Sequence, residues 1–107
     1  MPRQKMITKE ITEQIPALYA QDGKGDEAIV YAKWFCPWNN WRWFATELDQ
    51  ENGQAYGLVF GHEAELGYFN LNEMEEIRGG IGNMLYIERD IHFTPTTLAE
   101  VRKVYGD

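Results

Sequence analysis

The hydrophobic positions at the start of the chain follow a helical period and then change to a strand period. Apolar residues recur every three or four positions over residues 7–18, and Thr8 is a suitable helix N-cap. Proline fits poorly inside a helix, so the pattern predicts a short helix from about Lys9 to Ile15 and a new turn beginning at Pro16. Residues 22–26, rich in Gly and Asp, are typical of a loop.

Four β-type segments follow this loop. β-Branched and aromatic residues, or their alternation with polar ones, predict strands at Ala28–Phe35, Trp41–Leu48, Tyr56–Phe60 and Leu66–Phe69. Residues 49–53 predict a hairpin loop in which Asn52 and Gly53 both adopt positive φ. Strict alternation in the second strand gives one face Trp41, Trp43 and Ala45, and gives the other face Arg42, Phe44, Thr46 and Leu48.

The C-terminal third contains two clear helix starts. Asn70 and Glu73 have the spacing of a capping box, with Phe69 and Met74 at the positions of a hydrophobic staple. This pattern predicts a helix over 71–78 that is stopped by the glycine pair at 79–80. Alternation over 85–93 predicts a fifth strand, and the segment 94–97 opens a last helix with a second possible box from Thr97 to Glu100.

These elements predict an α+β fold. We expect an antiparallel meander sheet of about five strands with three helices, in the order α-β-β-β-β-α-β-α, and the helices packed on one face of the sheet. A length of 107 residues favours a single domain, residues 1–107.

Composition limits the classes of function. No apolar run approaches the ~20 residues of a membrane helix, and the first residues lack the apolar stretch of a signal peptide. We therefore expect no membrane contact. A single cysteine, Cys36, excludes an internal disulfide and favours a reduced, cytoplasmic protein. A net charge of −7 argues against direct nucleic-acid binding, because phosphate contacts need basic side chains.

The sequence contains one weak catalytic pattern. Two histidines and two carboxylates could bind a metal or share acid–base work if the fold brings them together; they are His62, Glu63, Glu65 and His92. Their spacing matches no metal motif, the chain has no serine, and the glycines at 79–82 follow a predicted helix where a phosphate loop would precede one. We therefore predict no cofactor and no resident metal, and an enzyme is the less favoured class.

Binding is the more favoured class because of the aromatic and acidic side chains. All four tryptophans lie between Trp34 and Trp43, and alternation places Trp41 and Trp43 together, where a helix would cover them. A Pro-Trp-Asn-Asn loop cannot easily bury every indole, so we expect most of the cluster in the core and Trp38 exposed at an interface. The predicted interaction residues around it are Asn39, Asn40 and Arg42. The acids assigned to the same function are Glu47, Asp49, Glu51, Glu63, Glu65, Glu73 and Glu76.

Several stretches together resemble a known family. They are Ile-Thr-Lys-Glu at 7–10, Ile-Pro-Ala-Leu-Tyr-Ala-Gln at 15–21, Trp-Arg-Trp-Phe-Ala-Thr-Glu at 41–47, Gly-His-Glu-Ala-Glu-Leu-Gly-Tyr-Phe at 61–69 and Ile-Glu-Arg-Asp-Ile-His-Phe-Thr-Pro at 87–95. The chain is similar, over nearly its whole length, to a family of small proteins of unknown function from plasmids, phages and integrated elements. Relatives inside long polyvalent proteins accompany antirestriction modules. The resemblance implies protection of incoming DNA and carries over no catalytic residue.

Three hypotheses of function follow. The first is a non-enzymatic interaction protein of a mobile element that blocks a host restriction or CRISPR-type effector, by occlusion or by nucleic-acid mimicry. Its partner would be a host protein with a basic nucleic-acid-binding surface, and a homodimer stays possible. The second is a module that sequesters a nucleotide near Trp38 and Arg42. The third is an uncharacterised hydrolase that uses the two histidines and their carboxylates.

Overall fold

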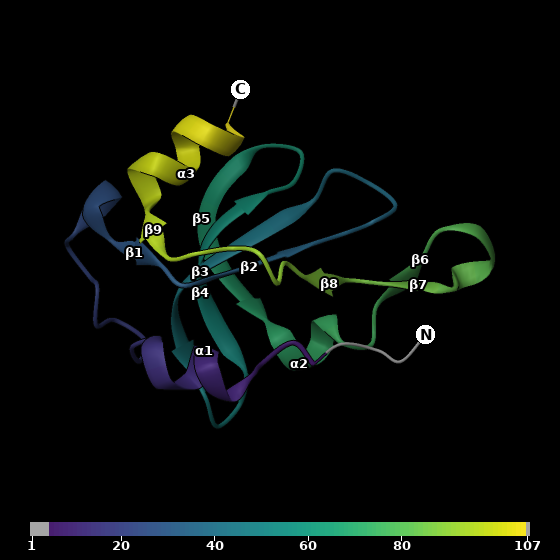
Figure 1. Cartoon of the computed structure of the whole chain (residues 1–107), viewed down its shortest axis with the longest axis horizontal. Helices are drawn as coiled ribbons and strands as arrows, with labels where there is room; N and C mark the ends of the chain where they lie inside the picture. The colour runs from purple at the N-terminus through teal and green to yellow at the C-terminus, as the bar shows by residue number, and fades with distance from the viewer. Residues whose placement is uncertain (1–4, 107) are drawn as a thin grey trace.

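An antiparallel sheet of five strands forms the centre of the molecule (Figure 1). The computed structural model describes residues 5–106. The strands are β2 (Ala32–Phe35), β3 (Arg42–Asp49), β4 (Gln54–Phe60), β5 (Ala64–Asn70) and β8 (Glu88–Arg89), in the spatial order β5-β4-β3-β2-β8. Since β2 to β5 follow one another along the chain, the predicted α+β meander is confirmed, with β8 added at the β2 edge.

Three α-helices flank the sheet, and each begins at a predicted cap. They are α1 (Lys9–Gln14), α2 (Leu71–Met74) and α3 (Leu98–Tyr105). The side-chain oxygens of Thr8, Asn70 and Thr97 accept hydrogen bonds from the backbone N–H three residues later, at 3.2, 3.1 and 3.1 Å. These bonds satisfy N–H groups that a helix start otherwise leaves unpaired.

The helices do not share one face of the sheet, so that prediction is wrong. Residues of α1 and α2 pack against Trp34 and Trp43 in one core cluster. Residues of α3 pack against Phe44 and Leu58 in a second cluster. Two neighbours in β3, Trp43 and Phe44, are large and apolar yet point to opposite faces, and each face therefore needs its own cover.

A β-bulge in β3 changes which side chains share a face. Ala45 pairs with Gly57 and Glu47 pairs with Tyr56, so one extra residue of β3 stands opposite a single step of β4. Beyond the bulge, Leu48 joins the core cluster of Trp43 and Ala45. The strict alternation that placed Leu48 with Phe44 is therefore wrong after residue 45.

The segment after α2 differs most from the prediction. The helix expected over 71–78 ends at Met74, and residues of β6 (Arg78–Gly79) instead pair with β7 (Leu85–Tyr86) in a separate hairpin that projects from the sheet (Figure 1). A short 3-10 turn, Ile81–Asn83, closes it. The strand expected over 85–93 is correspondingly divided between β7 and β8.

The strand predicted at 28–35 is also divided. A 3-10 turn at Gly25–Glu27 leads into β1 (Ile29–Val30), which pairs with β9 (Thr96–Thr97) just before α3. The chain then continues as β2 in the main sheet. In the hairpin loop at 49–53 only Gly53 has positive φ, at +78°, so Asn52 does not adopt the expected conformation. Among residues 5–106, no helix has the length and apolarity that a membrane span requires.

Candidate functional site

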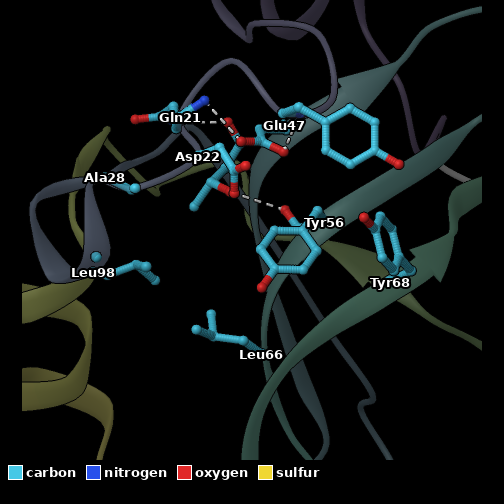
Figure 2. A pocket seen from close by; sticks show the side chains of 12 residues that line it. Gln21, Asp22, Ala28, Glu47, Tyr56, Leu66, Tyr68 and Leu98 are labelled. Carbon is cyan, nitrogen blue, oxygen red and sulfur yellow. Dashed lines mark hydrogen bonds between the residues drawn. The ribbon is translucent and has the colours of Figure 1, made fainter.

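A hollow with ligand-like dimensions lies on the α3 side of the sheet (Figure 2). Its volume is about 470 Å³, within the range typical of small-ligand sites. The loop before β1, three sheet strands and the start of α3 contribute its walls. The lining residues are Tyr19, Gln21, Asp22, Gly23, Gly25, Ala28, Thr46, Glu47, Tyr56, Leu66, Tyr68 and Leu98, and we call this hollow the tyrosine pocket.

Three tyrosines give the pocket its aromatic wall. Tyr56 and Tyr68 face each other across β4 and β5, with ring centroids 5.0 Å apart at an interplanar angle of 62°. A side-chain hydrogen bond with Tyr19 is the main cause that raises the pKa of Tyr68 to about 12. Tyr19 and Tyr68 are 65% and 50% exposed, so solvent and ligands can reach these rings.

Glu47 fixes the loop that carries Tyr19. The bulge in β3 places its side chain at the base of the pocket, where one carboxylate oxygen accepts from the Tyr19 N–H and the other accepts from the Gln21 N–H, both at 2.8 Å. Glu47 is 5% exposed, in contrast to the exposed acid expected from the sequence. Its position is structural, because a buried carboxylate bonded to two N–H groups holds the chain that supplies them.

Gln21 continues this network toward β1 and β3. Its amide oxygen accepts from the Ile29 N–H at 2.7 Å, and its amide nitrogen donates to the Thr46 carbonyl at 2.7 Å and to the Ile29 carbonyl at 2.8 Å. The loop is thereby tied to two strands by buried hydrogen bonds. Such a network presents Tyr19 at the pocket rim without large freedom of the backbone.

The pocket is acidic as well as aromatic. Among the described residues, its lining includes the carboxylates of Asp22 and Glu47 and no lysine or arginine. Each carboxylate oxygen can accept more than one hydrogen bond, so Glu47 keeps acceptor capacity beyond its two bonds from the backbone. The electron-rich faces of tyrosine rings attract cations and do not attract phosphate. The chemistry of this pocket therefore suits a positively charged group.

The remaining predicted acids separate into two groups at opposite ends of β4 and β5. Asp49 and Glu51 lie in or beside the β3–β4 loop, and Glu73 and Glu76 lie on or just after α2; we call these four residues the acidic end. The backbone bond from Leu71 N to the Gly53 carbonyl, 2.8 Å, joins the two segments. Glu63 and Glu65 lie in the β4–β5 turn and at the start of β5, roughly 20 Å away at ~3.4 Å per strand residue.

Within residues 5–106, no ion pair joins the acidic end to a basic side chain. Glu51, Glu73 and Glu76 are exposed. Between residues that the structure describes, the ion pairs are Lys33–Asp90 and Arg102–Asp26, each 3.1 Å, and neither involves the acidic end. Tyr19 lines both the tyrosine pocket and a second hollow of about 510 Å³ with Asp49 and Glu51, so the tyrosine pocket and the acidic end meet at Tyr19.

Trp38 is not the exposed anchor expected from the sequence. Its indole is partly buried against the first core cluster. A Cβ atom on Gly79 would lie 2.2 Å from the indole Cε2, so the backbone of β6 passes directly over the ring. Trp38 therefore supports the base of the β6–β7 hairpin, a contact between residues 41 positions apart that no local pattern indicates.

Asn39, Asn40 and Arg42 do lie together, in a hollow of about 310 Å³ that also involves Lys33 and Trp41. The Asn39 side chain accepts from the Trp41 N–H at 2.9 Å. The Arg42 guanidinium lies 4.9 Å from the centroid of the Phe60 ring, and its Nε is buried without a hydrogen-bond partner in the described part of the chain. Because this Nε is buried, it is an unsatisfied polar group and is not itself open to a ligand.

The proposed histidine and carboxylate cluster is not assembled. The His62 ring contacts Trp41 edge-on, with centroids 5.6 Å apart. The backbone N–H of His92 donates to Asp90 at 2.9 Å, in a segment that lies beside α3. Across residues 5–106, no three His, Cys, Asp or Glu side chains are arranged to hold a metal ion. Burial raises the pKa of the Cys36 thiol against a weaker opposing hydrogen bond from Asn39, which is the wrong direction for a nucleophile.

The β6–β7 hairpin exposes large apolar side chains that the sequence analysis did not assign. Ile81 and Met84 are 94% and 77% exposed, and Ile77 and Leu85 are also exposed. The signal in the sequence was a set of isolated apolar residues among glycines at 79–84, which the predicted helix cap had seemed to explain. The pocket tyrosines were likewise unassigned, because Tyr19 reaches Tyr68 only through the folded loop.

One of three comparisons with known proteins gave a match. A family model described as "Protein of unknown function (DUF2958)" matches residues 6–102. No curated protein matches the chain. No solved structure matches it either.

Proposed function

The chain belongs to the DUF2958 family of proteins of unknown function, and we propose that it is a non-enzymatic interaction protein of a mobile genetic element. It acts in counter-defence, by covering a basic nucleic-acid-binding surface of a host restriction or CRISPR-type effector. The resemblance to proteins of plasmids, phages and integrated elements supports the mobile-element part of this proposal.

The observation that carries the proposal is the unpaired charge of the acidic end. Its four carboxylates project from two segments that are bonded to each other, and no described basic side chain forms an ion pair with them. A basic groove that normally binds phosphates is complementary to such a surface, and charge complementarity provides both steering and specificity. The opposite end of the sheet also holds Arg42 and His62, so its acids Glu63 and Glu65 face a less uniform potential.

The exposed hairpin supports an interaction function. Large apolar side chains grouped on a projecting element, such as Ile81 and Met84, are typical of a protein contact. This hairpin takes the place that the sequence analysis gave to Trp38, which instead packs beneath it.

Two double variants of equal charge change test the proposal. Glu51→Lys with Glu73→Lys reverses the acidic end, and Glu63→Lys with Glu65→Lys reverses the other end. All four side chains are exposed, so both variants should keep the unfolding midpoint of the parent protein. The assay is transformation of a targeted plasmid into hosts carrying restriction or CRISPR-type systems, compared with the same hosts lacking them.

We expect the parent protein and the Glu63/Glu65 variant to raise transformation of a defended host. With the Glu51/Glu73 variant, transformation of the defended host should stay at the level measured without any protecting protein. Equal protection by all three proteins would contradict the role of the acidic end, and no protection by the parent protein in any host of the panel would contradict the function itself.

A second function, nucleotide sequestration, is favoured by one observation. Arg42 and Trp41 line the same hollow, which offers a guanidinium cation and an aromatic face. In this hypothesis the nucleotide base would contact Trp41, where the sequence had suggested Trp38. Titration with mononucleotides and cyclic nucleotides should quench tryptophan fluorescence in the parent protein and not in Arg42→Gln. A flat response of the parent protein across the panel would exclude this function.

A further inference from the structure

We infer that the tyrosine pocket binds the side chain of an arginine or lysine of the partner polypeptide. The inference rests on the proposed function and deepens it, because it identifies the group that the acidic surface would capture. Nothing in the family match assigns a site to these residues.

The lining chemistry selects a cation. Tyr19, Tyr56 and Tyr68 supply aromatic faces from three separate segments. The described wall of the pocket carries the carboxylates of Asp22 and Glu47 (Figure 2) and no basic side chain. Aromatic cages of this kind bind ammonium and guanidinium groups through the negative faces of the rings, and carboxylates add charge attraction. A phosphate or a carboxylic acid would meet repulsion from Asp22 and Glu47.

The pocket is also shaped for an aliphatic stem behind the charged head. Leu66, Ala28 and Leu98 form an apolar part of its wall. Lysine and arginine side chains bury their methylene groups against apolar surface while the charged end stays among polar groups. A volume of about 470 Å³ accommodates one such side chain together with part of its own backbone.

The edge of the sheet shows how a polypeptide can present this side chain. β5 is an edge strand, and two of its residues, Leu66 and Tyr68, line the pocket. A strand of the partner paired with the outer edge of β5 would direct alternate side chains toward the pocket face. Tyr19 then connects the pocket to the hollow at Asp49 and Glu51, where further basic residues of the same partner would lie.

A pair of short peptides tests the inference without the partner. The probes are acetyl-Gly-Arg-Gly-amide and the same peptide with citrulline, a neutral isostere of arginine. The readout is the NMR chemical shift of the tyrosine ring signals, which detects weak binding. We expect the arginine peptide to produce saturable shifts at Tyr19, Tyr56 and Tyr68, and the citrulline peptide to bind at least ~10-fold more weakly.

Two variants locate the binding. Tyr68→Leu removes a ring at a half-exposed position and should weaken arginine binding by roughly 2- to 30-fold, and Asp22→Asn should weaken it in the same direction. The matched control is Tyr86→Leu on the β6–β7 hairpin, which lies outside the pocket and should bind as the parent protein does.

Three results would overturn the inference: no tyrosine shifts, equal shifts with the citrulline peptide, or unchanged binding by Tyr68→Leu in a folded protein. Binding of free arginine amide without binding of the arginine peptide would also overturn it, because this result would indicate a small-molecule site. These outcomes are distinct from failure of the proposed function, because the peptide titration uses neither the acidic-end variants nor a host defence system.

Discussion

Glu47→Gln is the substitution that most directly tests how the pocket loop is held. The carboxylate accepts two backbone N–H bonds through separate oxygens, each 2.8 Å, and the residue is 5% exposed. Glutamine has nearly the same shape but only one acceptor oxygen. Whichever way its amide turns, the NH₂ group meets one of the two N–H donors.

The structure gives the size of the effect. The Gln21 N–H is buried and the Tyr19 N–H is only part-buried, so the variant should direct its oxygen to Gln21 and leave Tyr19 to be rehydrated in part. Loss of one charge-assisted bond and weakening of the other should lower the free energy of unfolding by about 1–3 kcal/mol. A domain of this size is stable by roughly 5–15 kcal/mol, so the variant should stay folded.

Urea unfolding followed by tryptophan fluorescence measures this change, since all four tryptophans lie in or against the core or in the sheet. Glu51→Gln, an exposed acid in the neighbouring loop, is the matched control and should change the unfolding free energy by less than about 0.5 kcal/mol. If Glu47→Gln is as stable as Glu51→Gln, the carboxylate does not hold the loop and this reasoning is refuted.

Two further predictions concern the sheet and one of its ion pairs. Gly57→Ala should lower the free energy of unfolding by more than about 3 kcal/mol, because its Cβ would lie 1.7 Å from the Phe44 carbonyl oxygen. Gly67→Ala, at the cross-strand partner with nothing within 4 Å, should be neutral or stabilising by about 0.5 kcal/mol. Urea unfolding midpoints compare the two variants, and similar midpoints would contradict the packing described for Gly57. For Asp90, burial raises the pKa, but the His92 N–H and the Lys33 ammonium outweigh burial and lower it below its ordinary value of 3.8. Its ionised form therefore stabilises the fold above that value, so the stability difference between the parent protein and Asp90→Asn should be constant from about pH 7 to pH 5 and should shrink below about pH 4. A difference that persists unchanged at about pH 2.5 would contradict this assignment.

Local signals accounted for much of the fold. The caps at Thr8, Asn70 and Thr97 lie three residues from the N–H groups they bind, and the meander follows from alternation with short loops. Such patterns are readable because both partners lie within a few residues of each other.

The errors came from contacts between distant residues. Because of the bulge in β3, Glu47 is a buried hydrogen-bond acceptor for the loop at 19–21, where the sequence predicted a surface acid. Gly79 lies against Trp38 in a hairpin, where the sequence predicted the end of a helix. For the same reason the tyrosine pocket was not predicted, since Tyr19 and Tyr68 lie on different segments that only the tertiary structure brings together. Asn39, Asn40 and Arg42 line one hollow because they are neighbours in sequence, and their function as interaction residues stays a prediction.

The most direct test of the central claim is a competition measurement on captured host protein. Tagged parent protein, incubated with a host lysate, should retain a nucleic-acid-handling protein, and added double-stranded DNA should release it because both ligands occupy the same basic surface. The Glu51/Glu73 charge-reversal variant should retain none. Retention of the same protein by that variant, or by the parent protein in the presence of saturating DNA, would contradict the account.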